Sequence, residues 1–213
     1  MLEIEKDRKT KTAVICPVLK TAAGMMTAEE EAARESEAAG LVLAMGQEVV
    51  FCETVRMSAI VPKSFFGKGT LERLKTACEE KGAELLVVDM PVSAVQQRNL
   101  EKMLNMKVID RTAVILEIFG QRAQTREGKL QVELAHLTYQ RGRLVRSWTH
   151  LERQRGGGGF LGGPGETQIE LDRRHLDERI VKIKKELEKV RQTRSIQRAA
   201  RVKVPYPVAA LVG

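Results

Sequence analysis

Residues 12–19 read TAVICPVL, a run without a single charged side chain. Three further apolar runs follow at residues 48–55 (EVVFCETV), 84–90 (ELLVVDM) and 107–109 (KVI). Several of them are apolar at consecutive positions, as strands buried on both faces of a parallel sheet are. The four runs therefore predict four β-strands in one small sheet.

Helical sequence separates these strands, and two helix starts are marked by capping boxes. Thr27 is followed three residues later by Glu30, and Ser93 by Gln96. At this spacing each side chain satisfies a backbone N–H that the first helical turn leaves free. Alternating strands and helices predict an α/β fold, a small parallel sheet with flanking helices and right-handed crossovers.

Beyond Asp110, which is suited to cap a helix, the pattern becomes that of long helices. Apolar residues recur at helical-seam spacing, with Arg141 at the one skipped position: Leu130, Leu134, Leu137, Leu144, Trp148 and Leu151. A second seam consists of Leu176, Ile180, Ile183, Leu187 and Val190, and Thr167 with Glu170 has the spacing that would cap its start. We expect a long antiparallel two-helix coiled-coil hairpin whose seam is packing, not a ligand groove.

A glycine-rich stretch at about residues 153–166 separates the two helices and is expected to form the hairpin tip. It contains GGGGFLGGPG, too much glycine to continue a helix. A plain turn needs fewer glycines, which favours a finger that follows an irregular RNA surface over a flexible connector. Arg153 and Arg155 would contact phosphate, and Phe160 would stack on a base.

Positive charge is concentrated in the second half of the chain. Between Arg141 and Lys203 there are 17 lysines and arginines against 8 aspartates and glutamates, whereas the preceding 140 residues hold 19 against 20. One-sided positive charge suits a polyanion such as nucleic acid. A solvated helix surface explains the charge equally well, so charge alone decides nothing.

Cysteine, histidine and hydropathy exclude several classes of protein. Cys16, Cys52 and Cys78 are odd in number and lie among apolar residues, which predicts reduced, packed thiols. His136, His150 and His175 lack metal-ligand spacing, so no zinc site is expected. No run is long and apolar enough for a membrane span, and the N-terminus does not resemble a signal peptide. These features predict a cytoplasmic protein without a membrane partner.

A short glycine motif in the first half is the one candidate for a small-ligand site. Gly67, Lys68 and Gly69 open a helix, where unpaired N–H groups and the helix dipole can hold an anion. A simple turn explains the same triplet. The alternative function is therefore a self-standing nucleotide-binding α/β enzyme that uses this turn, but paired carboxylates, a nucleophile with a base, and metal ligands are all missing there.

Several stretches together resemble one family, the HflX-type GTPases. They are FGKG at residues 66–69, VIDRT at 108–112, ILEIFGQRA at 115–123, TREGKLQVEL at 125–134, WTHL at 148–151, GPGETQ at 163–168 and DRR at 172–174. The likeness extends over about residues 45 to 213. It implies a small α/β domain (residues 1–111), a helical hairpin (112–203) and the first strand of a P-loop GTPase domain (204–213), in which Gly213 matches the first glycine of the phosphate loop.

The resemblance also implies partners and cofactors. Such proteins bind the large ribosomal subunit, reach rRNA with the hairpin and take part in ribosome splitting or rescue. GTP and Mg²⁺ are implied for the full-length parent, and no cofactor or GTP hydrolysis is expected of this chain alone. We expect a monomer. With the basic helix, the resemblance makes these residues the expected RNA contacts: Arg153, Arg155, Gly156, Gly157, Gly158, Gly159, Phe160, Gly163, Arg173, Arg174, Lys182, Lys185, Arg191 and Arg194.

Overall fold

A computed structural model describes residues 9–20, 26–154, 164–202 and 209 of the chain, without the side chains of residues 144–154, 164–169 and 200–202. It contains a four-stranded parallel sheet of β1 (Lys11–Leu19), β2 (Glu48–Met57), β3 (Leu85–Val88) and β4 (Lys107–Asp110), in the order β2-β1-β3-β4. The predicted α/β class and all four predicted strands are confirmed.

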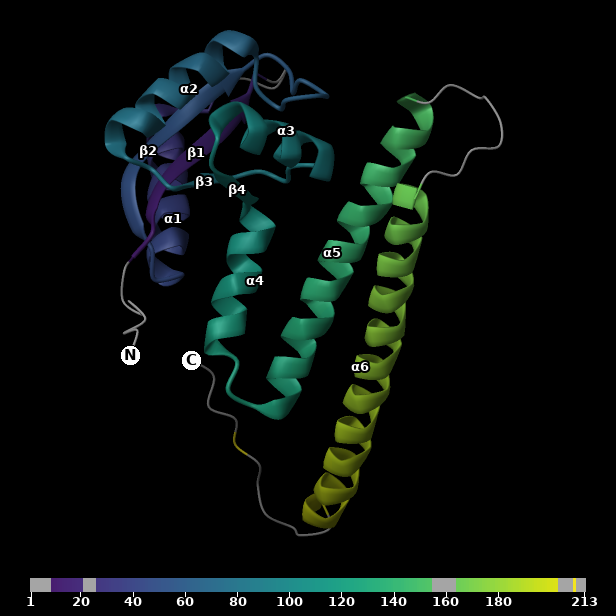
Figure 1. The fold of residues 1–213 in the computed structure, drawn as a ribbon. Coiled ribbons are helices and arrows are strands. Elements are labelled where there is room, and N and C mark those ends of the chain that lie inside the picture. Colours follow the sequence, from purple (N-terminus) through teal and green to yellow (C-terminus); the bar gives the residue numbers. More distant parts are fainter. Residues whose placement is uncertain (1–8, 21–25, 155–163, 203–208, 210–213) are drawn as a thin grey trace, which may run out of the picture.

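Helices cover both faces of the sheet (Figure 1). They are α1 (Ala28–Ala44), α2 (Lys68–Lys81), α3 (Ala94–Leu104) and α4 (Arg111–Arg122), followed by α5 (Arg126–Gln154) and α6 (Pro164–Val202). Both capping boxes are present: the side chains of Thr27 and Ser93 each accept a hydrogen bond from the backbone N–H three residues on, and their own backbone N–H groups donate to the side chains of Glu30 and Gln96. Asp110 caps α4, as expected.

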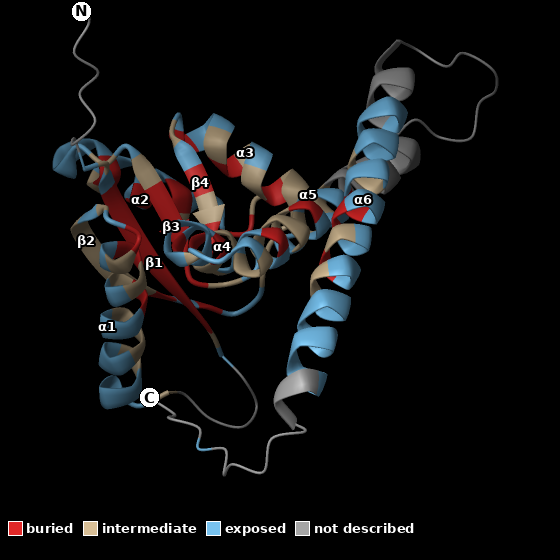
Figure 2. Ribbon diagram, turned by 90° about the horizontal axis from the view of Figure 1, so that it is seen from below, coloured by how far each residue is buried: buried red, intermediate tan, exposed pale blue. Residues whose placement is uncertain are grey.

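The sheet has a separate apolar core on each face. On one face, Ile15, Leu86 and Val108 pack with Phe65 and Leu74 beneath α2 and α3. On the other, α1 and α4 cover Val14, Cys16 and Val87. Because β1 and β3 are buried on both faces, their sequences are apolar without alternation. Figure 2 shows this burial as red along the central strands.

The predicted hairpin is also present, formed by α5 and α6. Its core contains Leu130, Leu137, Ile180, Ile183 and Leu187, with Leu134, Leu176 and Val190 packed against it. Ion pairs join Arg126 to Glu186, Glu133 to Arg179, and Arg141 to Asp177, so one helix ascends while the other descends. Leu144, Trp148 and Leu151 lie outside the described side chains.

Two details of the predicted hairpin are wrong. The helical sequence after Asp110 is not one helix, because Ala123 is extended and the chain starts α5 anew. There Thr125 accepts a 3.0 Å hydrogen bond from the Gly128 N–H, which caps the new helix. Second, α6 begins at Pro164, so Thr167 lies inside the helix instead of capping it. Proline suits a first helical position because the N–H it lacks would have no partner there.

Helix α4 packs against the sheet and not in the hairpin. Val114 and Ile118 belong to the same apolar core as Val14, Ala38 and Val42. The hydrophobic core of the α/β part therefore includes residues of α4. The hairpin begins with α5. The division at residues 111 and 203 stays a prediction.

Candidate nucleic-acid interface and its anchor

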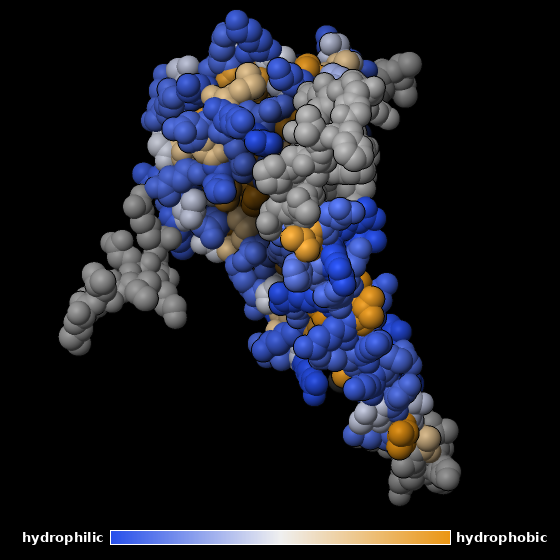
Figure 3. Space-filling model, turned by 45° about the vertical axis from the view of Figure 1, so that its right-hand side comes forward, coloured by the Kyte–Doolittle hydropathy of each residue, from blue (hydrophilic) through white to orange (hydrophobic). Residues whose placement is uncertain are grey.

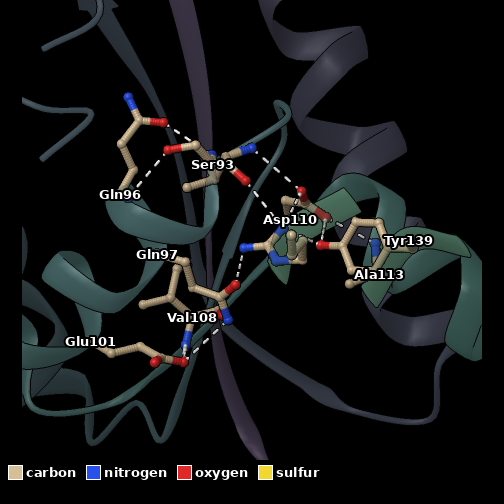
Figure 4. Close-up of polar contacts among 10 residues, drawn as sticks. Ser93, Gln96, Gln97, Glu101, Val108, Asp110, Ala113 and Tyr139 are labelled. Carbon is tan, nitrogen blue, oxygen red and sulfur yellow. Dashed lines mark hydrogen bonds and ion pairs between the residues drawn. The ribbon is translucent and has the colours of Figure 1, made fainter. Parts of the chain in front are cut away.

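Asp110 is the centre of a buried polar cluster where β4 ends and α4 begins (Figure 4). One carboxylate oxygen accepts hydrogen bonds from the Ala113 N–H at 2.9 Å and the Tyr139 hydroxyl at 2.8 Å. The other accepts from the Val92 N–H and an Arg143 Nη1, each at 3.3 Å. The residue is only 3% exposed, so its charge depends on these donors for stabilisation.

Arg143 of α5 connects the hairpin to the α/β part through this cluster. Its guanidinium donates to the Val92 carbonyl at 3.1 Å and to the Gln97 side-chain oxygen, and lies 4.9 Å from the Tyr139 ring centroid. Gln97 in turn donates to the Val108 carbonyl at 2.6 Å. Helix α5 is thus tied to α3, β4 and α4, and not only to α6.

The cluster also changes the chemistry of Tyr139. Burial and the hydrogen bond to Asp110 raise the pKa of the phenol, although Arg143 opposes the change. The hydroxyl therefore keeps its proton and remains a donor through the neutral pH range. Neither Tyr139 nor Arg143 belongs to the residues that the sequence singles out. Their spacing of four positions places both on one face of α5. This spacing is the feature of the sequence that could have indicated a shared polar contact.

A second ionic cluster at the carboxyl end of the sheet holds α1 and α4 together. Asp89, only 2% exposed, accepts hydrogen bonds from Arg34 at 2.8 Å and Arg111 at 2.7 Å. Arg111 also pairs with Glu37, and the hydrogen bonds to Glu37 and Asp89 raise the pKa of its guanidinium. Both arginines act here as structural cations.

The predicted RNA contacts on α6 fall into two groups. Arg173 lies 4.0 Å from Asp177, Arg174 lies 3.2 Å from Glu178, and Arg194 pairs with Glu127 of α5. Their charges are partly neutralised inside the protein, although each side chain is more than half exposed. A polyanion would have to compete with those carboxylates.

Lys182, Lys185 and Arg191 form the second group. All three side chains are exposed, and none has an ion pair with any residue that the structure describes. Figure 3 shows the mainly hydrophilic surface along α6, interrupted by apolar side chains. Among the described side chains of α6, the exposed large apolar ones are Leu171, Val181 and Ile196. These three cations are therefore displayed on α6 without an ion pair among the described residues.

The remaining predicted contacts lie outside the described residues or side chains. They are Arg153, whose backbone lies in the last turn of α5, and Arg155, Gly156, Gly157, Gly158, Gly159, Phe160 and Gly163 of the tip. Gly213, predicted to be the first glycine of a phosphate loop, also lies outside the described residues.

The motif of Gly67, Lys68 and Gly69 is placed as predicted but has no second feature that indicates a ligand. Gly67 is the N-cap of α2, and a side chain added at Gly67 or Gly69 would meet nothing within 4 Å. Lys68 is 88% exposed and lies 3.9 Å from Glu72. A turn that starts a helix explains all three residues.

Two open grooves lie where the hairpin meets the α/β part. One, of about 560 Å³, is lined by Ala94, Gln140, Arg143, Asp172, His175, Leu176 and Arg179.

In the described ranges, no three histidine, cysteine or acidic side chains gather as metal ligands would. The helices described also include none with both the length and the apolar content of a membrane span.

Two family models match the chain in succession. The GTP-binding GTPase N-terminal family matches residues 32–120, and the GTP-binding GTPase middle region matches residues 122–201. The boundary between them falls at the end of α4, one turn before α5 begins.

Curated relatives agree with these matches. The chain is 55% identical over 168 residues to the GTPase HflX of Magnetococcus marinus, covering 79% of this chain and 39% of that relative. It is 49% identical over 173 residues to the GTPase HflX of Escherichia coli, covering 81% and 40%. The chain thus spans about two fifths of the length of these relatives.

Solved structures share the fold at low identity. The crystal structure of SsGBP with GDP matches with a TM-score of 0.62 and 21% identity, covering 87% of this chain and 46% of that one. The GDP complex of a GTP-binding protein from Sulfolobus solfataricus matches with a TM-score of 0.57 and 22% identity, covering 85% and 46%. At such identity, the likeness concerns the fold alone.

Proposed function

This chain belongs to the HflX-type GTPase family as an N-terminal region, and we propose that it is the module that binds the large ribosomal subunit through rRNA. The observation that supports this proposal is a group of three exposed cations on α6 that have no ion pair among the described residues, Lys182, Lys185 and Arg191. Their neutralisation by phosphate would release counterions without breaking an internal ion pair, which favours binding.

The anchoring of the hairpin supports the same proposal. An RNA-binding helix recognises a fixed surface better when its orientation is set before binding, because less conformational freedom is lost. Here α5 is held by Asp110, Tyr139 and Arg143, and α5 holds α6 through the apolar seam. The cations of α6 therefore lie on a helix whose orientation relative to the α/β part is fixed by these contacts.

The proposal extends to a protein of the same length as the curated relatives, which would include a GTPase domain. We expect that protein to act in ribosome splitting or rescue in the cytoplasm, as a monomer, with GTP and Mg²⁺ as cofactors of its GTPase domain. The names of the curated relatives support the use of GTP.

The glycine-rich tip is proposed to be a finger that touches rRNA with Arg153, Arg155 and Phe160. Replacing those three residues together should leave the melting temperature unchanged and weaken binding to the large subunit, because a stacking contact and two charges are lost. A Ser/Gly linker substituted for residues 156–163 tests whether the tip is only a connector, in which case neither binding nor melting would change.

Co-sedimentation with isolated large and small ribosomal subunits over a series of salt concentrations tests the main proposal. The variant Lys182→Glu, Lys185→Glu, Arg191→Glu should lose binding to the large subunit, and the slope of log affinity against log salt should fall by roughly 2 to 3. The matched control reverses Lys81, Lys102 and Lys107, three exposed cations of the α/β part that have no ion pair among the described residues. If both triple variants lose binding equally, the interaction is only non-specific, and α6 is an ordinary solvated surface.

A further inference from the structure

The two edges of the sheet are treated differently. At the β4 edge, the outward-facing N–H of Val108 donates to Glu101 at 3.3 Å, and its carbonyl accepts from Gln97 at 2.6 Å. Side chains of α3 thus occupy backbone groups that another strand would otherwise use. With four residues, β4 is also short.

The opposite edge belongs to β2, which has ten residues. The Lys20 N–H donates to the Met57 carbonyl at 2.9 Å, so the backbone groups of Met57 face β1. Because these groups alternate along a strand, those of Cys52, Thr54 and Arg56 face outward. Within the described ranges, no hydrogen bond reaches the outward N–H or carbonyl groups of these three residues. We call this row the β2 free edge.

Features that usually protect an edge strand are weak along β2. It contains no proline, glycine or lysine, and its one arginine, Arg56, is held by Glu31 of α1 at 2.7 Å. The irregularity in its register with β1 lies between Val49 and Phe51, before the free edge. The Thr54 hydroxyl and one Glu53 carboxylate oxygen are buried without a hydrogen-bond partner among the residues described. Both atoms are buried, so what the middle of β2 offers to another strand is its outward row of backbone N–H and carbonyl groups.

The α1 side of the β2 free edge is acidic. Helix α1 runs beside β2, contacting it through the pair of Glu31 with Arg56 and the 3.6 Å approach of the Cys52 thiol to the Glu35 carbonyl. That helix has five glutamates and a single arginine: Glu29, Glu30, Glu31, Glu35, Glu37 and Arg34. An added strand would lie next to this negative helix, which favours a positively charged occupant.

We propose that the β2 free edge binds an extended, basic segment of a protein partner, which adds to the sheet as a fifth strand. Backbone hydrogen bonds to Cys52, Thr54 and Arg56 would supply binding, and lysine or arginine side chains beside α1 would supply selectivity. A second copy of this chain fits less well, because pairing β2 with β2 would bring two acidic α1 helices together. This site lies across the molecule from α6, as Figures 1 and 2 show, and does not depend on the proposed RNA contacts.

The test measures fluorescence anisotropy of a labelled peptide in which lysine alternates with valine, mixed with the whole chain. Thr54→Pro removes one outward N–H while leaving the side that pairs with β1, so it should weaken binding about five- to tenfold. Thr54→Val is the matched control, since it keeps the N–H and should bind like the parent. Circular dichroism and thermal melting establish that both variants fold; if Thr54→Pro does not, a peptide N-methylated at alternate residues replaces it.

Each outcome has a defined meaning. Loss of binding with the proline variant or the N-methylated peptide, together with weak binding of a glutamate–valine counterpart, supports the proposal. Equal binding of the basic and acidic peptides, or no binding of either, would overturn it. Sedimentation of the chain as a dimer that Thr54→Pro dissociates would also overturn it, in favour of a second copy. Ribosome binding by the same variants is measured separately, because it tests α6 and not β2.

Discussion

The Tyr139 hydroxyl donates a 2.8 Å hydrogen bond to the Asp110 carboxylate, which joins the hairpin to the end of the last strand. Asp110 also caps α4, so one carboxylate fixes the direction of two successive helices. The short break between α4 and α5 would otherwise allow the hairpin several orientations. A hydrogen bond between buried groups therefore sets where the basic surface of α6 lies.

Removing that hydroxyl should destabilise the protein. Tyr139→Phe keeps the ring and leaves the Asp110 carboxylate short of one donor, so the free energy of unfolding should fall by about 1.5–3 kcal/mol. Urea denaturation followed by circular dichroism measures the change. A double-mutant cycle with Asp110→Asn isolates the pair, and additive effects of the two changes would mean that the hydrogen bond contributes nothing.

Two glycines should respond in opposite directions to alanine. Gly82 ends α2 with a φ of 64°, a left-handed conformation that costs an alanine about 1–2 kcal/mol. Gly40 lies inside α1, with nothing within 4 Å of an added Cβ, so Gly40→Ala should stabilise by about 0.5–1 kcal/mol. Thermal melting of the two variants should show a lower temperature for Gly82→Ala and a higher one for Gly40→Ala. A fall for both would show that α1 does not accept a side chain at residue 40.

Arg141 interrupts the apolar seam of α5 and pairs with Asp177 of α6 at 2.6 Å. Both side chains are about 40% exposed, so the pair should contribute no more than about 1 kcal/mol to stability. We expect Arg141→Leu to be neutral or slightly stabilising, because leucine would extend the apolar seam beyond Leu137. Chemical denaturation measures this change. A loss above about 2 kcal/mol would show instead that the ion pair fixes the register of the hairpin.

The cysteines should differ in reactivity. Burial raises the pKa of the Cys78 thiol to about 11, and a hydrogen bond to Cys52 raises that of Cys16, which is fully buried. The hydrogen bond with Cys16 lowers the pKa of Cys52, which is only half-buried. Iodoacetamide at pH 8 should therefore alkylate Cys52 first, as peptide mass spectrometry of the native protein would show. Equal labelling of all three in the folded state would contradict this assignment.

The same pKa shift predicts a loss of stability in alkali. The thiol of Cys78 titrates near 9.0 when unfolded and near 11 when folded, so its contribution is complete below about pH 9 and disappears as the pH rises toward 11. Unfolding free energies measured across this range should decline more steeply for the parent than for Cys78→Ala. Parallel curves would mean that Cys78 ionises equally easily in both states.

Local sequence was enough to predict elements whose signals lie within a few residues. The capping boxes at Thr27 and Ser93 were found because their partners are three positions away. The seam through Ile180, Ile183 and Leu187 was found because helical periodicity repeats it. The break before α5 was missed, since apolar residues continue at helical spacing across it and only Thr125 marks the new start.

Sequence by itself determined the parallel α/β sheet, the two-helix hairpin and the location of the positive charge, because periodicity and composition are properties of neighbouring residues. Tertiary structure decided which cations are free. Arg173 and Arg174 have carboxylates four positions on, whereas Arg194 meets Glu127 only because α5 lies alongside α6. It also decided that Asp110 serves both α4 and α5, and that the β4 edge is capped while the β2 edge is open. Those relationships join residues distant in sequence, and they exist only once burial of the apolar faces has brought the helices and strands together.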